Sequence, residues 1–590
     1  MPAPRLVTLW KQCSSQPLTL ASIILLSVTA ISSLRFLIVP NLRRLHLQVN
    51  LTLFDYGFYG FYPTRDYVSV EYKSPDVEIA QWDAECSHDY VFIAPHGNAV
   101  EDPAAMILDS RGNLVWMMPF FDGAQDFRVQ EYLGAKYLTY WHGRGSWSML
   151  DSSYIHRFEI EPVGNFDGNM HDLRITENGT ALITIYETIP TDLSTIGGPL
   201  YGYIRDCLFQ EIEVGTGKLL FQWRISDHVP FDSSFKEIKG SGWDRDDAYD
   251  AYHVNSIDKD QFGNYLLSSR HTHSILSIDG KSGEILWTLG GKFNDFIDIS
   301  EGKATDFAWQ HDARWHDDYT LTLLDNTAEW FLDGPTQSRA MTLELDVPNR
   351  VARLRATYFH PEGIRATSQG NVQVLSESGN VFVGWGHCAA YTEFSKNGRV
   401  LCDTHFGPSN WFQLGQVVSY RVTKSSWIGR PNTIPAAAVI GSSVFVSWNG
   451  ATEVVAWRLE LWDGFSIDDM QFDPSKVVKK DGFETEIELP PDLSTVYYRV
   501  VALNDQYDIL GMTEVLGKQQ NWAFRDLVQS YVGLFSQGVG LSIFMLGCSF
   551  LLVAYWAFKK CACPFISHHY RLVPSNINEN GEDEVSLSPL

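Results

Sequence analysis

The chain has 590 residues, of which 45% are hydrophobic and 20% are charged, a balance typical of folded proteins and not of disordered ones. Its length is several times the roughly 100–150 residues of a common domain, so two or more folded units are expected. The formal net charge of −26, with no Lys/Arg-rich run, argues against a nucleic-acid partner. Because an acidic surface repels anions, any anionic substrate must be held by local groups.

The first apolar segment, residues 18–34, is shorter than the roughly 20 residues that a membrane-spanning helix needs. It fits the hydrophobic region of a signal peptide, with the Val-Thr-Ala sequence at 28–30 as a small-residue cleavage site. Arginines at positions 43 and 44 follow closely, so an uncleaved anchor is the alternative. We therefore expect residues 1–39 to be a cytosolic n-region plus a signal peptide or signal anchor.

The second apolar segment, residues 538–558, carries no charge and is long enough to cross a bilayer. Lys559 and Lys560 follow at once, and the positive-inside rule then places the C-terminus in the cytosol. We predict a transmembrane helix at 538–558 and an acidic, disordered cytosolic tail at 559–590. The bulk of the chain is then lumenal or extracellular, tethered by one span or by two if the N-terminal segment is uncleaved.

Sequons and cysteines fit this secretory compartment. Asn50 and Asn178 stand in Asn-x-Thr glycosylation sequons. Four cysteines lie outside the apolar segments and their flanks: Cys86, Cys207, Cys388 and Cys402. They permit two disulfides, and the sequence does not choose among the three pairings. Cys388 and Cys402 are the favoured pair, because a short meander could bring them together; buried free thiols are the alternative.

One pattern repeats from about Tyr90 to about Arg421: an apolar strand ends in an acidic residue, a Gly-containing turn follows, and a second strand often ends in Trp. Three copies are Ile107–Trp116, Ile212–Trp223 and Leu276–Trp287. Short strands joined by Gly turns and recurring at tens of residues, with helical periodicity nearly absent, predict an all-β propeller. A solenoid would show a shorter and stricter period. We place this β-propeller at 90–431, after a lumenal lead-in segment at 40–89.

A second β unit is predicted at 432–516. Residues 444–450 and 455–461 alternate apolar and polar side chains, as half-buried strands do. The stretch 491–504 resembles the late strands of a fibronectin type III domain, whose usual pattern is Tyr-x-Val-x-Ala-x-Asn. We expect a fibronectin type III-like β-sandwich that acts as a spacer, joined to the membrane segment by a linker at 517–537.

Several histidines stand in short polar motifs at predicted strand ends. They are His171, His253, His271, His273, His311 and His387. A single histidine of this kind is more often a structural hydrogen-bonding residue than a catalyst. Together they could point into one funnel, because the strands of different propeller blades converge at its centre.

Four motifs resemble the arylsulfotransferase (ASST) family, including its eukaryotic, largely fungal, membrane-anchored branch. In chain order they are His171-Asp172, His253-Val254-Asn255-Ser256, Ser269-Arg270-His271 and Gln310-His311-Asp312-Ala313. The resemblance implies a six-bladed propeller that moves a sulfuryl group from a phenolic sulfate ester to an acceptor phenol, through a sulfohistidine and without a nucleotide donor. It implies no cofactor and no metal.

The resemblance also implies residue roles. His311 matches the nucleophile, His253 and Arg270 match groups that bind the sulfuryl oxygens, and His171 matches the histidine that serves the phenolic oxygen. Asn255 supports the oxygen-binding groups, and His271, His273 and His387 are further substrate-binding candidates. A planar guanidinium suits two sulfuryl oxygens, and a neutral imidazole is a competent nucleophile near pH 7. The expected ligand is a small phenol or aryl sulfate.

Three alternatives remain open at this point. His271 and His273, two apart on a strand, would face one side and could hold zinc or copper with His253 or His311, although no ligand cluster of standard spacing accompanies them. A membrane-anchored propeller could instead be a non-catalytic ligand-binding or cell-surface module. The Trp-ending repeats alone suggest a quinoprotein-like dehydrogenase, but blade packing explains those tryptophans more simply. The predicted membrane anchor and sandwich depart from the soluble bacterial enzymes, so the reaction could also have changed.

Overall fold

The computed structural model describes residues 26–27, 29, 51–118, 123–317, 319–329, 337–462, 472–490 and 497–517. Nearly all of the first predicted apolar segment, and all of the second with the tail that follows, lie outside these residues, as does Asn50. No helix of the described residues is long and apolar enough to cross a membrane. Apart from residues 26–27 and 29, the described residues belong to one compact unit, Val39–Val528.

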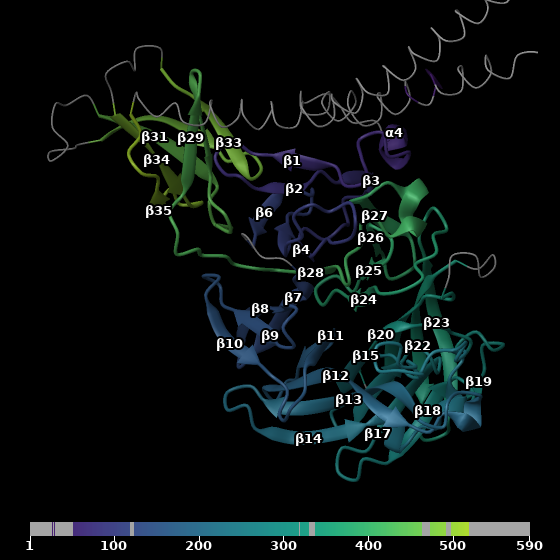
Figure 1. Cartoon of the computed structure of the whole chain (residues 1–590). Helices are drawn as coiled ribbons and strands as arrows, with labels where there is room; N and C mark the ends of the chain where they lie inside the picture. Colours follow the sequence, from purple (N-terminus) through teal and green to yellow (C-terminus); the bar gives the residue numbers. More distant parts are fainter. Residues whose placement is uncertain are drawn as a thin grey trace, which may run out of the picture. The chain divides into compact units, whose positions relative to one another are not determined.

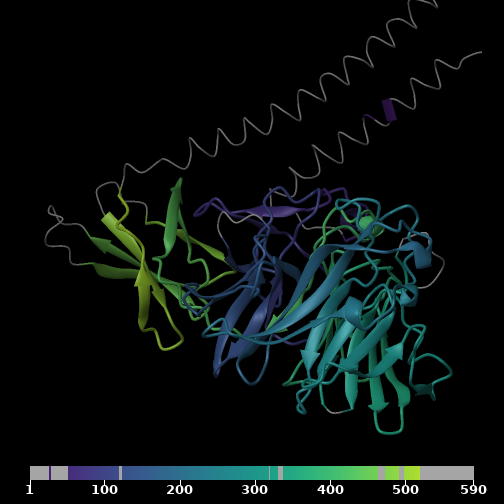
Figure 2. The same ribbon diagram turned by 60° about the horizontal axis from the view of Figure 1, so that its bottom comes forward.

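The described part is all-β, and most of its strands form six sheets (Figures 1 and 2). The first comprises β7 (Gln125–Tyr132), β8 (Ala135–Trp141), β9 (Trp147–Leu150) and β10 (His156–Ile160). The second comprises β11 (Gly168–Ile175), β12 (Thr180–Thr191), β13 (Gly202–Glu213) and β14 (Leu219–Arg224). The third comprises β15 (Val254–Lys259), β16 (Tyr265–Ser269), β17 (Ser274–Ile278) and β18 (Ile285–Gly290).

The other three sheets contain strands that are distant in sequence. The fourth comprises β20 (His311–Trp315), β21 (Thr320–Asp325), β22 (Arg339–Asp346), β23 (Val351–Phe359) and the short parallel β19 (Ile297–Asp298). The fifth comprises β24 (Asn371–Val374), β25 (Val381–Gly384), β26 (Ala390–Phe394), β27 (Val400–His405) and β3 (Glu78–Trp82). The sixth comprises β28 (Thr423–Ser425), β4 (Tyr90–Ile93), β5 (Met106–Leu108) and β6 (Leu114–Met117).

The six sheets contact one another as a propeller-like ring. Their first strands touch in chain order, β7 with β11, β11 with β15, β15 with β20, and β20 with β24. β24 then contacts β28, whose sheet partner β4 contacts β7, so the series returns to the first sheet. β28 and β4 pair antiparallel, and one sheet thereby ties together the two ends of the predicted propeller region. The first strand of each sheet is therefore its inner strand.

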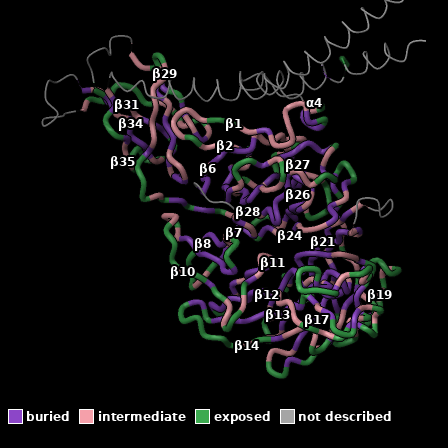
Figure 3. Tube along the Cα trace, viewed as in Figure 1, coloured by how far each residue is buried: buried purple, intermediate pink, exposed green. Residues whose placement is uncertain are grey.

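The sequence repeats correspond to one recurring hairpin. The three copies span β5–β6, β13–β14 and β17–β18, the last two strands of the sixth, second and third sheets. Trp116, Trp223 and Trp287 lie on the outermost of these strands and are buried. Buried residues, purple in Figure 3, follow the strands, whereas the turns are largely exposed. Each tryptophan thus packs in the hydrophobic core, as blade packing predicts.

The segment predicted as a separate lead-in contributes to this array. β3 pairs antiparallel with β27 and forms the outer edge of the fifth sheet. The helix α4 (Leu51–Asp55) contacts the same region, because Asp55 Oδ1 accepts from Nδ1 of His405 at 3.1 Å. The short strands β1 (Thr64–Asp66) and β2 (Lys73–Pro75) form a ribbon of their own. The boundary at residue 89 therefore falls after structure that already belongs to the fifth sheet.

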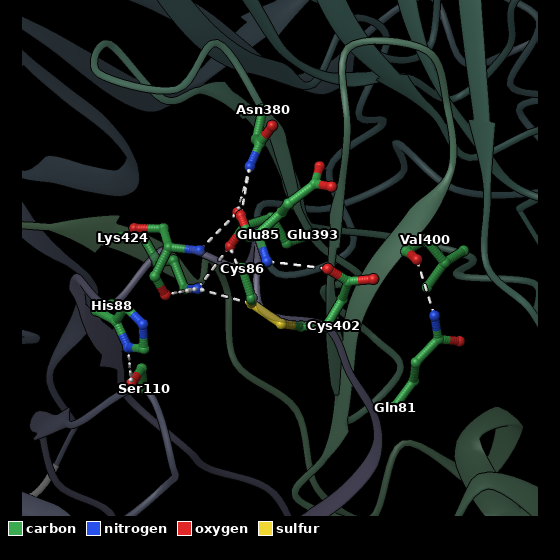
Figure 4. Close-up of a disulfide and its surroundings, with 12 residues drawn as sticks. Gln81, Glu85, Cys86, His88, Ser110, Asn380, Glu393, Val400, Cys402 and Lys424 are labelled. Carbon is green, nitrogen blue, oxygen red and sulfur yellow. Dashed lines mark hydrogen bonds and ion pairs between the residues drawn. A yellow bond between two sulfur atoms is a disulfide. The ribbon is translucent and has the colours of Figure 1, made fainter.

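A disulfide joins Cys86 to Cys402 of β27 (Figure 4). Cys207 and Cys388 are buried free thiols, so the favoured Cys388–Cys402 pairing is wrong. Ala390 of β26 lies opposite His405 of β27, and extending this register sets Cys388 opposite position 407, five residues beyond Cys402. Five residues span roughly 17 Å along a strand. Disulfide partners need Cα atoms within about 7 Å.

Two smaller sheets follow the propeller-like array. One comprises β29 (Ala436–Ile440), β30 (Ser443–Ser447) and β33 (Glu484–Glu488). The other comprises β32 (Asp473–Lys479), β31 (Ala456–Trp462), β34 (Tyr497–Leu503) and β35 (Ile509–Met512). Val444 and Ile487 of the first sheet and Trp457 and Val500 of the second share one buried core. The two sheets therefore pack face to face.

Candidate active site

The histidine motifs converge because of where their strands begin. His171 lies in the first half of β11, His253 directly precedes β15, and His311 is the first residue of β20. The inner strands lie side by side around the ring, so their first residues gather at one end. Arg270 and His271 occupy the turn after β16, and their backbone N–H groups donate to His253 and Tyr252 across the β15–β16 pair. That turn is therefore at the same end.

His171 and His253 face each other directly. Their Nε2 atoms are 3.1 Å apart. Nδ1 of His253 lies 2.5 Å from Asp250 Oδ2, and Nδ1 of His171 is hydrogen-bonded to Asn169 Oδ1. The ring of Tyr186 stacks on His171 with centroids 5.0 Å apart. Each ring is thus held at its Nδ1 atom, and the two rings meet at their Nε2 atoms.

His271 orients Arg270. Nδ1 of His271 donates to the Asp250 carbonyl oxygen at 2.6 Å, which leaves its Nε2 to accept from Arg270 Nη1 at 2.8 Å. Nη2 of Arg270 donates to the Thr367 carbonyl at 3.2 Å, and the guanidinium lies 5.1 Å from the ring centre of Trp309. The buried Nε of Arg270 has no hydrogen-bond partner among the described residues. A fixed guanidinium with a donor to spare is suited to an anionic ligand.

His311 is held as the Nδ1–H tautomer. Its Nδ1 donates to Asn326 Oδ1 at 2.7 Å. The Asn326 amide nitrogen in turn donates to the Ala366 carbonyl at 2.7 Å, so the amide orientation is set and Oδ1 must be an acceptor. Nε2 of His311 then carries the lone pair, which accepts a hydrogen bond of 3.2 Å from the backbone N–H of Gln369. This is the nitrogen that can act as a nucleophile.

Burial sets the charge state of these rings. It lowers the pKa of His311 well below the usual range, and the positive charge of Arg270 lowers that pKa further. Burial likewise lowers the pKa of His171, His253 and His271. A proton on a ring is therefore tolerated only beside a compensating acid, and Asp250 acts in that direction on the pKa of His171. His311 contacts no acid among the residues that the structure describes, and it is a neutral imidazole near pH 7.

Comparison with known families points the same way as this geometry. The model of the arylsulfotransferase (ASST) family matches residues 128–407, from β7 to just beyond β27. This match supports the arylsulfotransferase family for this chain. No curated protein matches the chain. The arylsulfotransferase match covers every strand and turn that carries the cluster of His171, His253, Arg270, His271 and His311.

Solved structures offer distant likenesses. A protein of unknown function from Bacteroides caccae is 13% identical at a TM-score of 0.34, with 57% of this chain and 98% of that one covered. An inactive variant of virginiamycin B lyase from Staphylococcus aureus is 7% identical at a TM-score of 0.31, with 64% and 97% covered. The Dos1 propeller is 9% identical at a TM-score of 0.27, with 63% and 75% covered. TM-scores this low support neither a shared fold nor a shared function.

The aspartates of the arylsulfotransferase motifs do not orient their neighbouring histidines. Asp172 accepts from Arg128, Arg314 and Arg421 at 2.7, 2.8 and 2.9 Å. Asp312 accepts from Arg314 at 2.9 Å. With Asp126, these form a buried cluster of three aspartates and three arginines drawn from β7, β11, β20 and the residue range before β28. Its charges cancel, and it ties the inner strands together beneath the histidines.

Three of the predicted binding residues make their contacts elsewhere. The Asn255 amide donates to the Gln310 carbonyl at 2.6 Å and so braces β15 against β20. His273 stacks on Phe235 with centroids 4.1 Å apart. Nε2 of His387 lies 3.3 Å from the Gln413 carbonyl oxygen. None of these contacts is with the histidines of the cluster.

The predicted metal alternative does not fit the turn geometry. His271 and His273 are not on a strand but in the β16–β17 turn, where one ring contacts Asp250 and the other stacks on Phe235. Asp250, His253 and His271 do offer ligand atoms within 4.8 Å of one another. Both nitrogens of His271 are nevertheless engaged, one by the Asp250 carbonyl and one by Arg270.

Sequence reasoning missed several residues of the site. Asp250, Asn169 and Asn326 contact the Nδ1 atoms of His253, His171 and His311, but no motif included them. Tyr420 sets its ring edge against His171 with centroids 5.7 Å apart. Its buried hydroxyl has no hydrogen-bond partner among the described residues, like Oε1 of Gln369 and Oδ1 of Asp250. These unpaired buried atoms indicate a place for a polar ligand. The one available signal was Asp250, three residues before His253.

Proposed function

We propose that the chain transfers a sulfuryl group from a phenolic sulfate ester to an acceptor phenol, without a nucleotide donor. The observation that carries the proposal is the convergence of His171, His253 and His311 of neighbouring inner strands with Arg270 of the β16–β17 turn, inside the region that matches the arylsulfotransferase family. Sulfuryl transfer resembles phosphoryl transfer in needing mainly positioning and charge complementarity. A buried guanidinium beside neutral imidazoles meets both needs.

The proposed reaction has two steps. Nε2 of His311 forms a bond to sulfur while the bond between sulfur and the aryl oxygen breaks, and its electron pair leaves on that oxygen as a phenolate. His171 and His253 supply the phenolate with a proton. The acceptor phenol then attacks the sulfur of the sulfohistidine and gives its own proton to the same pair. The nitrogen–sulfur bond breaks, and its electrons return to His311.

Two contacts support these roles. Asn326 fixes the His311 tautomer from the side away from the lone pair, as the orienting member of a nucleophilic triad does. Nε of Arg270 has no hydrogen-bond partner among the described residues. The positive charge of Arg270 adds to burial in lowering the pKa of His311, His253 and His171. A charge that acts on all three rings can bind sulfuryl oxygens between them.

We also infer the finer architecture. The ring of six sheets is a six-bladed propeller, and the two-sheet unit at 432–516 is a fibronectin type III-like sandwich. The chain is tethered to a membrane of the secretory pathway by its C-terminal apolar segment, as in the fungal-type branch. A small aryl sulfate or phenol then reaches the site from the lumenal or extracellular side.

A mass measurement tests the reaction. The purified full-length chain is incubated with phenyl sulfate and digested, and the peptide that contains His311 is examined for an added sulfuryl group. His387→Ala is the matched control, because His387 makes its contacts outside the cluster. An adduct in the parent and the control supports the proposal. No adduct and no transfer from any aryl sulfate would favour the non-catalytic ligand-binding module instead.

A further inference from the structure

Four side chains of the site form one unbroken hydrogen-bonded chain. It runs from Asn169 Oδ1 to Nδ1 of His171, from Nε2 of His171 to Nε2 of His253, and from Nδ1 of His253 to Asp250 Oδ2. The second and third contacts measure 3.1 and 2.5 Å. At such distances a hydrogen must lie in each contact, because two facing lone pairs repel. Three contacts therefore require three hydrogens.

Both ends of this chain are acceptors. Asn169 Oδ1 also accepts the backbone N–H of His171 at 3.3 Å, which sets the orientation of the amide. A carboxylate such as that of Asp250 can only accept. The hydrogens must come from His171 and His253, and each neutral imidazole carries a single N–H. Whichever tautomers are chosen, two hydrogens serve three contacts, and one contact is left with two lone pairs face to face.

We propose that the chain Asn169–His171–His253–Asp250 holds one proton more than a carboxylate and two neutral imidazoles supply, and that this stored proton is the one exchanged with the phenolic oxygen. With the extra proton on the pair of rings, the carboxylate of Asp250 and the two imidazoles together carry no net charge. A neutral set is the least costly one to bury.

The surroundings disfavour a second extra proton on the pair. Burial lowers the pKa of both rings, and Arg270 lowers both further, whereas Asp250 acts in the opposite direction on His171. The titratable and charged groups that face the pair are Asp250, Arg205, Lys236, Arg270, Arg421, His271, Tyr186 and Tyr420. Four of these are cations, so a second charge on the pair would be strongly opposed.

A metal ion between the two Nε2 atoms is the rival occupant. It would have two protein ligands only, because both nitrogens of His271 are engaged. It would also stand near Arg270, whose charge reaches both rings. Structural and catalytic zinc sites use at least three protein ligands. A proton needs none beyond the two nitrogens.

The consequence for the reaction rests on the proposed function. When the bond between sulfur and the aryl oxygen breaks, the leaving oxygen takes the stored proton from Nε2 of the pair. When the acceptor phenol attacks the sulfohistidine, its O–H proton refills the same position. The pair thus ends each cycle with the proton count with which it began, and no other acid or base is consumed.

The proton count is tested on the full-length chain labelled with ¹⁵N-histidine, by the ring nitrogen shifts at pH 7. His171→Gln and His253→Gln assign the signals. We expect both Nδ1 atoms to be protonated and one further proton to be shared between the two Nε2 atoms. In Asp250→Asn, the new amide can donate to His253, so three hydrogens are present without the extra proton and two neutral rings should appear. Asp505→Asn, an exposed change between β34 and β35, should match the parent.

Three results would overturn this inference. They are two neutral rings in the parent, identical shifts in the parent and Asp250→Asn, or a stoichiometric metal whose removal by a chelator changes the shifts. If Asp250→Asn does not fold, His171→Gln serves the same purpose, because a glutamine amide can donate to Nε2 of His253. That variant should then show a neutral His253 protonated at Nδ1, and an imidazolium there would contradict the count.

The role of the proton is tested by kinetics. Asp250→Asn should slow transfer from phenyl sulfate by on the order of 10²-fold, the usual contribution of a general acid. It should slow transfer from 4-nitrophenyl sulfate less, because a more acidic leaving phenol needs less help. Equal losses on both esters would refute the acid–base role while leaving the proton count intact. A parent without any transfer activity would remove the proposed function, and the nitrogen shifts would still decide the count.

Discussion

At the scale of single residues, carboxamides and one carboxylate decide what each histidine can do. Asn326 leaves the lone pair of His311 on Nε2, where a nucleophile needs it. Asn169 and Asp250 turn the free nitrogens of His171 and His253 toward each other. Rings of the same chemistry thus receive different roles from the atoms behind them.

Replacement of the nucleophile should be the most damaging change. His311→Ala should abolish both adduct and transfer, because the covalent path disappears. Arg270→Lys should reduce transfer strongly although the charge is kept, because the planar fork is lost. Asn255→Ala should reduce transfer least, because the Asn255 amide donates to the Gln310 carbonyl and not to a histidine of the cluster. Transfer rates and melting temperatures of the three variants check this order, and parental activity in His311→Ala would disprove the assignment.

A buried histidine outside the site should make stability depend on pH. Burial alone would lower the pKa of His405, but hydrogen bonds and charges of Asp403 and Asp55 outweigh it and raise the pKa to about 10. The unfolded pKa is about 6.5. The stabilisation is therefore fully present below about pH 6.5 and is lost as pH rises toward 10, by about 1.4 kcal/mol per pH unit.

Denaturant unfolding between pH 6 and 10 measures this loss. His405→Gln, which cannot carry the charge, should show a flatter profile across the same window. His156→Gln is the control, because His156 lies half-exposed on β10 and its loss should leave the parental slope. Parallel profiles for the parent and His405→Gln would rule out a charged His405 in the folded protein.

At the scale of elements, the inner strands position the site through their first residues. His253 and Asp312 have φ angles of 54° and 55°, in the left-handed region that side chains other than glycine rarely adopt. Such backbone persists only where surrounding contacts hold it. Here the Asp250 contact and the buried arginine–aspartate cluster do so. The backbone at these two strand ends is therefore held in a conformation that sets the direction of the side chains.

The disulfide should stabilise the fifth sheet. Cys86 and Cys402 are 316 residues apart in sequence, so the bond closes a very long loop. Cys402→Ser should lower the free energy of unfolding by about 2–5 kcal/mol. Cys388→Ser should not remove any disulfide. Peptide mapping without reductant, together with denaturant unfolding, checks both statements, and a peptide that links Cys388 to Cys402 would contradict the structure.

The turn between β11 and β12 should carry a glycan. Asn178 is exposed there, within the Asn-Gly-Thr sequon, and so is accessible to modification. Asn178→Gln expressed in a secretory host should run faster on a gel than the parent. Digestion with an endoglycosidase should remove that difference. A parent whose mobility equals that of Asn178→Gln before digestion would show that the site is unused.

At the scale of the whole molecule, charge is distributed unevenly. The chain carries a net charge of −26, whereas the proposed ligand is an anion. Long-range attraction therefore cannot recruit an aryl sulfate, and the site must hold it by short contacts. Arg270 is buried beside the histidine cluster, while the three arginines beneath are neutralised by three aspartates. One guanidinium is thus left for the ligand.

The tail after the second apolar segment should be cytosolic. Lys559 and Lys560 border that segment, and such residues favour the cytosolic side. Protease added to sealed microsomes should remove the tail and leave the β-rich part intact. Detergent should then expose the whole chain, which controls for intrinsic resistance. A tail protected until detergent is added would reverse the predicted topology.

The sequence by itself determined the all-β fold class and indicated the polar motifs whose residues the structure brings together. Repeated hairpins with a terminal tryptophan indicate β-sheets of one design, because side-chain alternation and turn chemistry are local properties. Likewise His171, His253, Arg270 and His311 stand in polar motifs at strand ends, and such motifs are visible without coordinates. These are features that depend on residues close together in the chain.

Only the tertiary structure decided the partners of these residues. Asp250 and Asn326 define proton positions through contacts that no motif spacing predicts. Cys86 reaches Cys402 because β3 joins β27 across more than 300 residues, a pairing that no local pattern specifies. Asp172 and Asp312 follow their histidines in sequence, but Asp172 pairs with Arg128 of another strand and Asp312 pairs with Arg314 two residues further along its own strand. Adjacent residues on a strand face opposite sides, so closeness in sequence does not imply contact.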